Sequence, residues 1–174
     1  MKLFHYAILL LMSMMVVSCI NDENKTSEET TLVRLGDKAP NFTVEFYPSG
    51  SISLSSLQGE VVLLTFWDPE CPTCRKEIAV AQQRIIDRFE GEAFHYLPIA
   101  RGQDYNSIKA FFLANGYTFP VGIDPKREIY NLYASKYVPR SFIIDKQGFI
   151  RHIYVEYELP ELNSIISAIE QMLE

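Results

Sequence analysis

Two cysteines three residues apart are the best candidates for chemistry in this 174-residue chain, in the segment Cys71-Pro72-Thr73-Cys74. An almost continuous apolar run at 61–67 precedes them, as in a strand buried on both faces, and apolar residues at helical spacing follow. The pattern predicts that Cys71 lies at a helix N-terminus, where free amides and the helix dipole favour a thiolate. Cys74 would lie one turn deeper and stay a thiol. One sulfur could then attack a disulfide while the other resolves it.

A static disulfide and half of a metal site are the other interpretations of this pair. The third cysteine, Cys19, stands alone, so no second pair completes a zinc site, and we expect neither metal nor cofactor. Haem attachment requires a histidine directly after the second cysteine, where this chain has Arg75. A peroxiredoxin site requires a threonine at a fixed distance before its cysteine, and Asp68 stands at that place.

The first 18 residues have the pattern of an export signal. Lys2 gives a basic start, and the apolar stretch at 6–17 is shorter than the ~20 residues that a membrane-spanning helix needs. The segment Val16-Val17-Ser18-Cys19 resembles the lipobox of bacterial lipoproteins, so we expect lipid attachment at Cys19. An uncleaved anchor, or an ordinary signal followed by a chance cysteine, are the alternatives.

We therefore expect a lipoprotein signal peptide at 1–18, a polar and acidic tether at 19–33, and one folded domain at 34–174. The formal net charge of −6 argues against nucleic acid as a partner and against binding to anionic membranes through charge. Lipid would instead anchor the protein to a bacterial membrane. The domain would face the periplasm or the cell surface, and the sequence leaves the leaflet open.

The elements that must position the cysteines alternate between strand and helix, which predicts an α/β sheet with helices on both sides. We expect strands at 43–46, 52–54, 61–67 and 94–100, helices at 72–90, 105–114, 126–136 and 160–173, and a hairpin formed by 142–145 and 149–154. Pro98 predicts a bulge or a poor boundary in its strand.

The segment 66–77 is similar to the active-site segment of the TlpA/ResA-type periplasmic thioredoxins, and the similarity extends to 36–42, 57–62 and 138–145. It covers roughly residues 34 to 173. This resemblance implies a thioredoxin-like fold, with a central mixed sheet flanked by helices and an N-terminal strand extension. The activity that it implies is dithiol–disulfide exchange.

The resemblance also assigns roles to residues outside the cysteine pair. Pro139 matches the family's cis-proline, which faces the disulfide, and Val138 would pair with an extended substrate peptide. Glu77 matches a glutamate that could take the proton from Cys74. Trp67 matches a tryptophan that packs beside the site. The plainer alternatives are a trans proline that opens a strand, a solvated helix carboxylate and a core tryptophan.

Three positions depart from the thioredoxin pattern. Thr65 stands where cytoplasmic thioredoxins keep a buried aspartate, which predicts that a proton relay is absent there. Glu70 replaces a tryptophan, and Arg140 follows the cis-proline where threonine is common. Glu70 and Asp68 are negative beside Cys71 and should oppose the helix dipole, which predicts a weaker oxidant than the strongly oxidising members.

The function expected from these features is the reduction of disulfides in exported proteins, with a membrane electron donor that regenerates the dithiol. The reverse direction, oxidation of substrate thiols, is an alternative. A lipoprotein that uses the domain for non-catalytic binding or as a scaffold, with a merely structural disulfide, is another.

Overall fold

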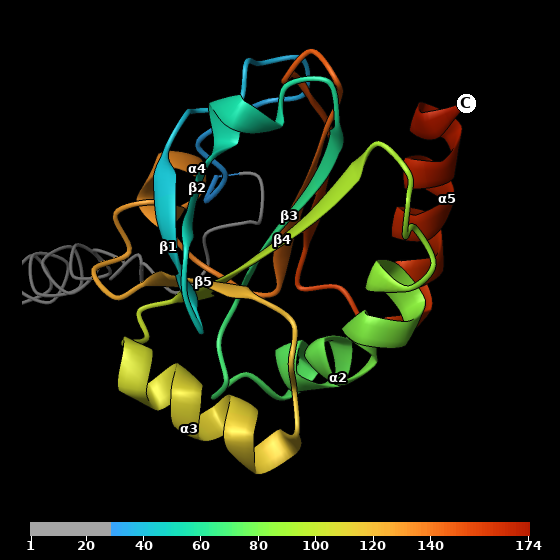
Figure 1. The fold of residues 1–174 in the computed structure, drawn as a ribbon. Coiled ribbons are helices and arrows are strands. Elements are labelled where there is room, and N and C mark those ends of the chain that lie inside the picture. Colours follow the sequence, from blue (N-terminus) through green and yellow to red (C-terminus); the bar gives the residue numbers. More distant parts are fainter. Residues whose placement is uncertain (1–28) are drawn as a thin grey trace, which may run out of the picture.

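The computed structural model describes residues 29–174, which contain one seven-stranded mixed sheet in the order β2-β1-β5-β4-β3-β6-β7 (Figure 1). The strands are β1 (Thr43–Tyr47), β2 (Ser51–Ser53), β3 (Val61–Trp67), β4 (Phe94–Arg101), β5 (Val121–Asp124), β6 (Arg140–Ile144) and β7 (Ile150–Val155). The α-helices are α2 (Pro72–Ala81), α3 (Tyr105–Asn115), α4 (Tyr130–Tyr133) and α5 (Leu162–Leu173). Two short 3-10 helices, η2 (Leu54–Leu57) and η4 (Leu159–Glu161), and a π-helical segment, η3 (Gln82–Ile86), which continues α2, complete the set.

Strand β3 lies at the centre of the functional part of the sheet. It pairs in parallel with β4 and antiparallel with β6, and all seven of its residues are buried. A strand paired on both sides and covered on both faces needs apolar side chains throughout, which explains the continuous hydrophobic run at this place. Strand β1 pairs antiparallel with β2 and with β5, and it forms the N-terminal extension that the resemblance implies. The mixed sheet flanked by helices is as predicted.

Alternate side chains of β3 enter different cores, as the pleat of a strand requires. Val62, Leu64 and Phe66 pack in a cluster with residues of α4 and η2. Leu63 packs in a second cluster with residues of α5, and Trp67 packs in a third with residues of α2 and α3. Figure 1 shows α2 and α5 on one side of the sheet and α4 on the other. Thr65 shares the face of Leu63 and Trp67, which directs its side chain toward α2 and α5.

Some elements differ from the sequence-based predictions. The expected bulge at Pro98 is wrong, because β4 keeps a continuous parallel register with β3 and Pro98 lies opposite Thr65. The register shift of this sheet lies instead between β6 and β7, at Ile143 and Ile144. Strand β5 was not predicted, since its four residues are too few to show a period. The predicted helix at 126–136 contains only the four residues of α4.

The first described residues are packed against the domain, although we assigned them to the tether. Thr30 is fully buried, and the amide of Leu32 donates to the carbonyl of Tyr133 at 2.8 Å. Thr31 forms an isolated β-bridge with Ala134, and Arg140 donates to the hydroxyls of both threonines. The folded part therefore begins before the boundary predicted at residue 34. A buried arginine needs hydrogen-bond acceptors, and this segment supplies two of them.

No helix in residues 29–174 is long and apolar enough to cross a membrane. The predicted signal peptide at 1–18 and the predicted lipid attachment at Cys19 lie outside the described residues.

Candidate active site

Cys71 occupies the N-cap position of α2, directly before Pro72 at the first helical position. The backbone amide of Cys74 donates to Cys71 Sγ at 3.2 Å, and the hydroxyl of Thr73 lies 3.1 Å from the same sulfur. The first amides of a helix lack partners within the helix, so a sulfur at this cap is a ready acceptor for them. This geometry stabilises negative charge on Cys71 Sγ more than a site elsewhere on the helix would.

Cys74 lies one turn further and differs from Cys71 in its surroundings. Its side chain is fully buried in the cluster that contains Trp67 and Ile78, whereas Cys71 is only partly buried. Burial raises the pKa of Cys74 far above the ordinary thiol range, and the hydrogen bond with Cys71 raises it further. Both cysteines are free thiols in this structure. The two sulfurs therefore differ in access to solvent and in the cost of ionisation.

The loop before β6 brings Val138 and Pro139 to the cysteine pair. The peptide bond between them is cis, and the thiol of Cys71 donates to the carbonyl of Val138 at 3.6 Å across 67 residues of chain. Strand β6 pairs with β3, and β3 leads directly into the cysteine loop. The sheet thus brings two segments that are distant in sequence together at Cys71 Sγ.

Glu77 is buried, with 2% of its surface exposed, and is not the solvated carboxylate that the alternative interpretation expects. Its Oε1 accepts a hydrogen bond from the Tyr157 hydroxyl at 2.5 Å, while Oε2 has no hydrogen-bond partner among residues 29–174. Burial raises the pKa of Glu77 to about 7, against the opposing effect of the Tyr157 hydrogen bond. A carboxyl group with a pKa near neutrality can both accept and release a proton.

Trp67 is fully buried at the end of β3, where it contacts the rings of Phe111 and Phe112 on α3. It belongs to the same cluster as Cys74. Trp67 is therefore a core residue and also packs beside the cysteine site, so the two interpretations of its role do not exclude each other. Its large ring is part of the apolar cluster in which Cys74 is buried.

Asp68 is held by several donors rather than standing as a bare charge. Its Oδ1 accepts from the amide of Glu70 at 3.0 Å and from the side chain of Gln103 at 3.2 Å. Its Oδ2 lies 3.8 Å from the guanidinium of Arg101, and both side chains are largely buried. A paired carboxylate acts less on a neighbouring sulfur than an isolated one. The predicted opposition between Asp68 and the helix dipole is correspondingly reduced.

A row of hydroxyls, not foreseen from the sequence, begins at Thr65. Its Oγ1 lies 2.7 Å from Ser141 Oγ, and Ser141 Oγ lies 2.7 Å from the Tyr157 hydroxyl, which reaches Glu77. Ser141 lies in a segment that the resemblance covers, but nothing around Tyr157 in the sequence marks it as a site residue. The contact between Tyr157 and Glu77 spans 80 residues and arises only from the packing of α2 against the end of β7.

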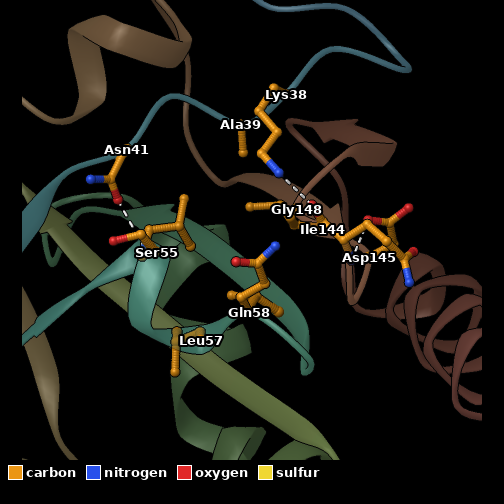
Figure 2. A pocket seen from close by; sticks show the side chains of 12 residues that line it. Lys38, Ala39, Asn41, Ser55, Leu57, Gln58, Ile144, Asp145 and Gly148 are labelled. Carbon is orange, nitrogen blue, oxygen red and sulfur yellow. Dashed lines mark hydrogen bonds between the residues drawn. The ribbon is translucent and has the colours of Figure 1, made fainter.

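A separate small pocket lies far from the cysteines, near the start of β3 (Figure 2). Strand β3 spans about 20 Å from Val61 to Trp67, so the pocket and the cysteine pair lie near its opposite ends. Figure 2 shows Lys38, Ser55, Gln58 and Asp145 around the pocket, with Leu57 and Ile144 among its apolar residues. Lys38 Nζ donates to the carbonyl of Gln147 at 2.5 Å, and so it is already partnered. Within residues 29–174 no group of three or more metal-ligating side chains is placed to hold a metal ion.

The chain is similar to known proteins along most of its length. A family model described as the AhpC/TSA family matches residues 35–153. The thiol-disulfide oxidoreductase ResA of Bacillus cereus is 30% identical over 146 residues, which cover 84% of this chain and 83% of that relative. ResA of Bacillus thuringiensis is 30% identical over 116 residues, or 67% of this chain and 66% of that relative.

Two solved structures share the fold. A candidate protein disulfide isomerase from Bacteroides thetaiotaomicron is 32% identical, with a TM-score of 0.77 and coverage of 83% of this chain and 92% of that one. A candidate thiol:disulfide interchange protein DsbE from Chlorobium tepidum is 26% identical, with a TM-score of 0.75 and coverage of 82% and 99%.

Proposed function

Because this chain belongs to the AhpC/TSA family and to the thiol–disulfide oxidoreductases related to ResA, we propose that it reduces disulfides of exported proteins through Cys71 and Cys74. The observation that carries this proposal is the asymmetry of the two thiols. Cys71 is partly exposed and accepts an amide hydrogen bond at the helix N-terminus, whereas Cys74 is fully buried. An attacking sulfur needs access and stabilised charge, and a resolving sulfur needs protection until the mixed disulfide forms.

The reaction proceeds in two exchanges. The Cys71 thiolate attacks one sulfur of a substrate disulfide, forms a mixed disulfide and expels the first substrate thiolate, which takes up a proton from water. Cys74 then gives its proton to Glu77 and attacks Cys71 Sγ, and the second substrate thiolate leaves. The substrate gains two electrons and the enzyme ends with a Cys71–Cys74 disulfide.

In the proposed reaction, the loop of Val138 and Pro139 binds the substrate. The carbonyl of Val138 lies 3.6 Å from Cys71 Sγ, so a peptide whose disulfide reaches this sulfur passes beside the loop backbone. An extended peptide can pair with such a backbone through main-chain hydrogen bonds, which recognise shape rather than sequence. This mode suits an enzyme that acts on several exported proteins.

The oxidised enzyme requires two electrons before it can act again. We assign their supply to a membrane electron donor, because lipid on Cys19 would hold the domain at the membrane surface. Cys19→Ala should release the protein from the membrane fraction and abolish incorporation of labelled fatty acid. If the variant stays in the membrane fraction and still incorporates labelled fatty acid, the lipid anchor at Cys19 is contradicted. The proposed chemistry of Cys71 and Cys74 does not depend on that result.

Trapping of substrates tests the exchange reaction directly. The Cys74→Ser variant should accumulate mixed disulfides between Cys71 and exported proteins, visible as bands that disappear after reduction. The double variant Cys71→Ser/Cys74→Ser is the matched control and should trap nothing. A scaffold with a structural disulfide would trap nothing in either variant. An insulin-reduction assay and a measured redox potential separate reduction from the alternative, oxidation of substrate thiols.

A further inference from the structure

Four buried oxygen-bearing side chains form a continuous hydrogen-bonded row from the sheet to the cysteine helix. Thr65 on β3 meets Ser141 on β6 at 2.7 Å, Ser141 meets Tyr157 at 2.7 Å, and Tyr157 meets Glu77 on α2 at 2.5 Å. Thr65 and Ser141 are fully buried, and Tyr157 is 7% exposed. Buried polar groups are costly unless they are satisfied, so a row of four such groups calls for a reason.

The direction of these hydrogen bonds follows from the chemistry of the end group. An ionised Glu77 can only accept, so Tyr157 must donate its single proton to Oε1. Tyr157 then accepts from Ser141, and Ser141 accepts from Thr65. Each hydroxyl is thus oriented by the next one in the row. Thr65 on β3 and Ser141 on β6 together hold the Tyr157 hydroxyl in place.

The second oxygen of Glu77 is left free by this arrangement. Oε2 is buried and has no hydrogen-bond partner in residues 29–174. Glu77 follows Cys74 by three residues in α2, so both side chains lie on one face of the helix. The charge of Glu77 also contributes to the raised pKa of Cys74, after the larger effects of burial and of Cys71.

We propose that Tyr157 is a positioning residue, held by Ser141 and Thr65, which fixes Oε1 of Glu77 and leaves Oε2 to take the proton of Cys74. This inference rests on the proposed role of Glu77 as proton acceptor and adds the group that orients it. In the step concerned, the S–H bond of Cys74 breaks and an O–H bond to Oε2 forms, with no change of oxidation state. The Cys74 thiolate then attacks the mixed disulfide.

The titratable side chains that face Glu77 come from α2, from β4 and from the segment after β7. Cys74 faces it from α2, Tyr96 from β4 and Tyr157 from the segment after β7. Burial and the charge of Glu77 raise the pKa of both tyrosines, so they stay neutral at physiological pH. The pH dependence of the resolving step therefore reports on Glu77 and Cys74. Since the Tyr157 hydrogen bond lowers the pKa of Glu77, its removal should raise that pKa.

The test compares Tyr157→Phe with the natural protein in the resolving step alone. A chromogenic aryl disulfide forms a mixed disulfide with Cys71, and the rate at which Cys74 releases the second aryl thiolate is followed against pH. We expect the midpoint of the Tyr157→Phe profile to move upward by about one pH unit, because a hydrogen bond to the ionised form is lost. The carboxyl carbon-13 signal of Glu77 should titrate with the same upward shift.

Tyr154→Phe is the matched control, because Tyr154 is a partly buried tyrosine whose ring packs against that of Tyr157. It should keep the natural midpoint. Ser141→Ala should shift the midpoint in the same direction as Tyr157→Phe, and Ser141→Thr, which keeps a hydroxyl, should restore it. These two variants also keep the proposal testable if Tyr157→Phe does not fold.

The variants test the role of Glu77 as proton acceptor separately from the role of Tyr157 in positioning it. If Glu77→Gln resolves mixed disulfides at the natural rate with an unchanged pH profile, the role of Glu77 itself is wrong. If Glu77→Gln is slow and loses the pH dependence, but folded Tyr157→Phe keeps the natural midpoint, only the positioning role of Tyr157 is overturned. Loss of thermal stability without a shift in midpoint or in the carbon-13 titration would show a purely structural tyrosine.

Discussion

The carboxylate of Glu77 accepts a hydrogen bond at 2.5 Å from the hydroxyl of Tyr157, which lies 80 residues further along the chain. Both side chains are buried, and they join the cysteine helix to the segment that follows the last strand. Ionisation of a carboxyl group in this buried and weakly polar environment costs free energy. That cost gives the protein a measurable dependence on pH and on the state of one residue.

Stability of the reduced protein should fall as the pH rises through the range set by Glu77. Its pKa is about 7 in the folded state against an ordinary value of 4.5. Between these values the folded state binds more protons than the unfolded state, so the free energy of unfolding decreases with pH. The total loss should be about 3 kcal/mol between pH 4 and pH 8. Urea unfolding across this range, under reducing conditions, measures it.

Glu77→Gln is the control for this pH effect. It cannot ionise, and its amide oxygen can still accept from Tyr157. The difference in unfolding free energy between the two proteins should grow from pH 5 to pH 8, with Glu77→Gln the more stable at pH 8. Parallel curves for the two proteins would contradict a raised pKa for Glu77.

Of the two cysteines in the active-site segment, only Cys71 should be alkylated in the reduced, folded protein. Cys74 is fully buried and its raised pKa keeps it protonated, and the thiolate is the reactive form. Peptide mass spectrometry after a short exposure to iodoacetamide should find label on Cys71 and none on Cys74, and addition of denaturant should expose both of these thiols. Equal labelling of the two cysteines in the folded protein would rule out the asymmetry on which the proposed mechanism depends.

Arg140→Ala should destabilise the fold and free the first described residues. The guanidinium is fully buried and donates to the hydroxyls of Thr30 and Thr31 and to the carbonyl of Lys136. Loss of these hydrogen bonds should cost about 2–4 kcal/mol in the free energy of unfolding. Hydrogen exchange of residues 30–33 should accelerate at the same time.

Arg151→Ala provides the comparison for Arg140. Arg151 is half exposed and pairs with Asp145 at 2.6 Å. A pair of this kind at the surface contributes little, so the loss should stay below about 1 kcal/mol. Equal losses in the two variants would show that Arg140 does not hold the N-terminal segment.

Gly122→Ala should disturb the contact between the N-terminal strands and the rest of the sheet. A Cβ atom at this position would lie 2.8 Å from Val44 on β1 and 3.0 Å from Ile99 on β4. Crowding of this kind should cost about 1–3 kcal/mol, as measured by chemical denaturation. Ser51→Ala, at an exposed position on the edge strand β2, should change stability by less than about 0.5 kcal/mol. If Gly122→Ala leaves the free energy of unfolding unchanged, close packing of β1 against β5 and β4 does not contribute to stability at this position.

The amino-acid sequence by itself determined the central features of the site. The apolar run at 61–67 matches β3 residue for residue, and the proline after Cys71 opens α2 where the spacing predicts. Strand period, helix start and the position of a cysteine between them are local properties, and local properties can be read from the order of residues.

Only the tertiary structure decided the surroundings of Glu77. Its position one turn after Cys74 was evident, but its burial and its contact with Tyr157 depend on how α2 packs against the segment after β7. The same holds for β5, which is recognisable only by its pairing with β1 and β4, and for Thr30, which is buried through Arg140. Contacts between residues far apart in the chain leave no periodic pattern along the sequence, so they become visible only when the elements are placed together in space.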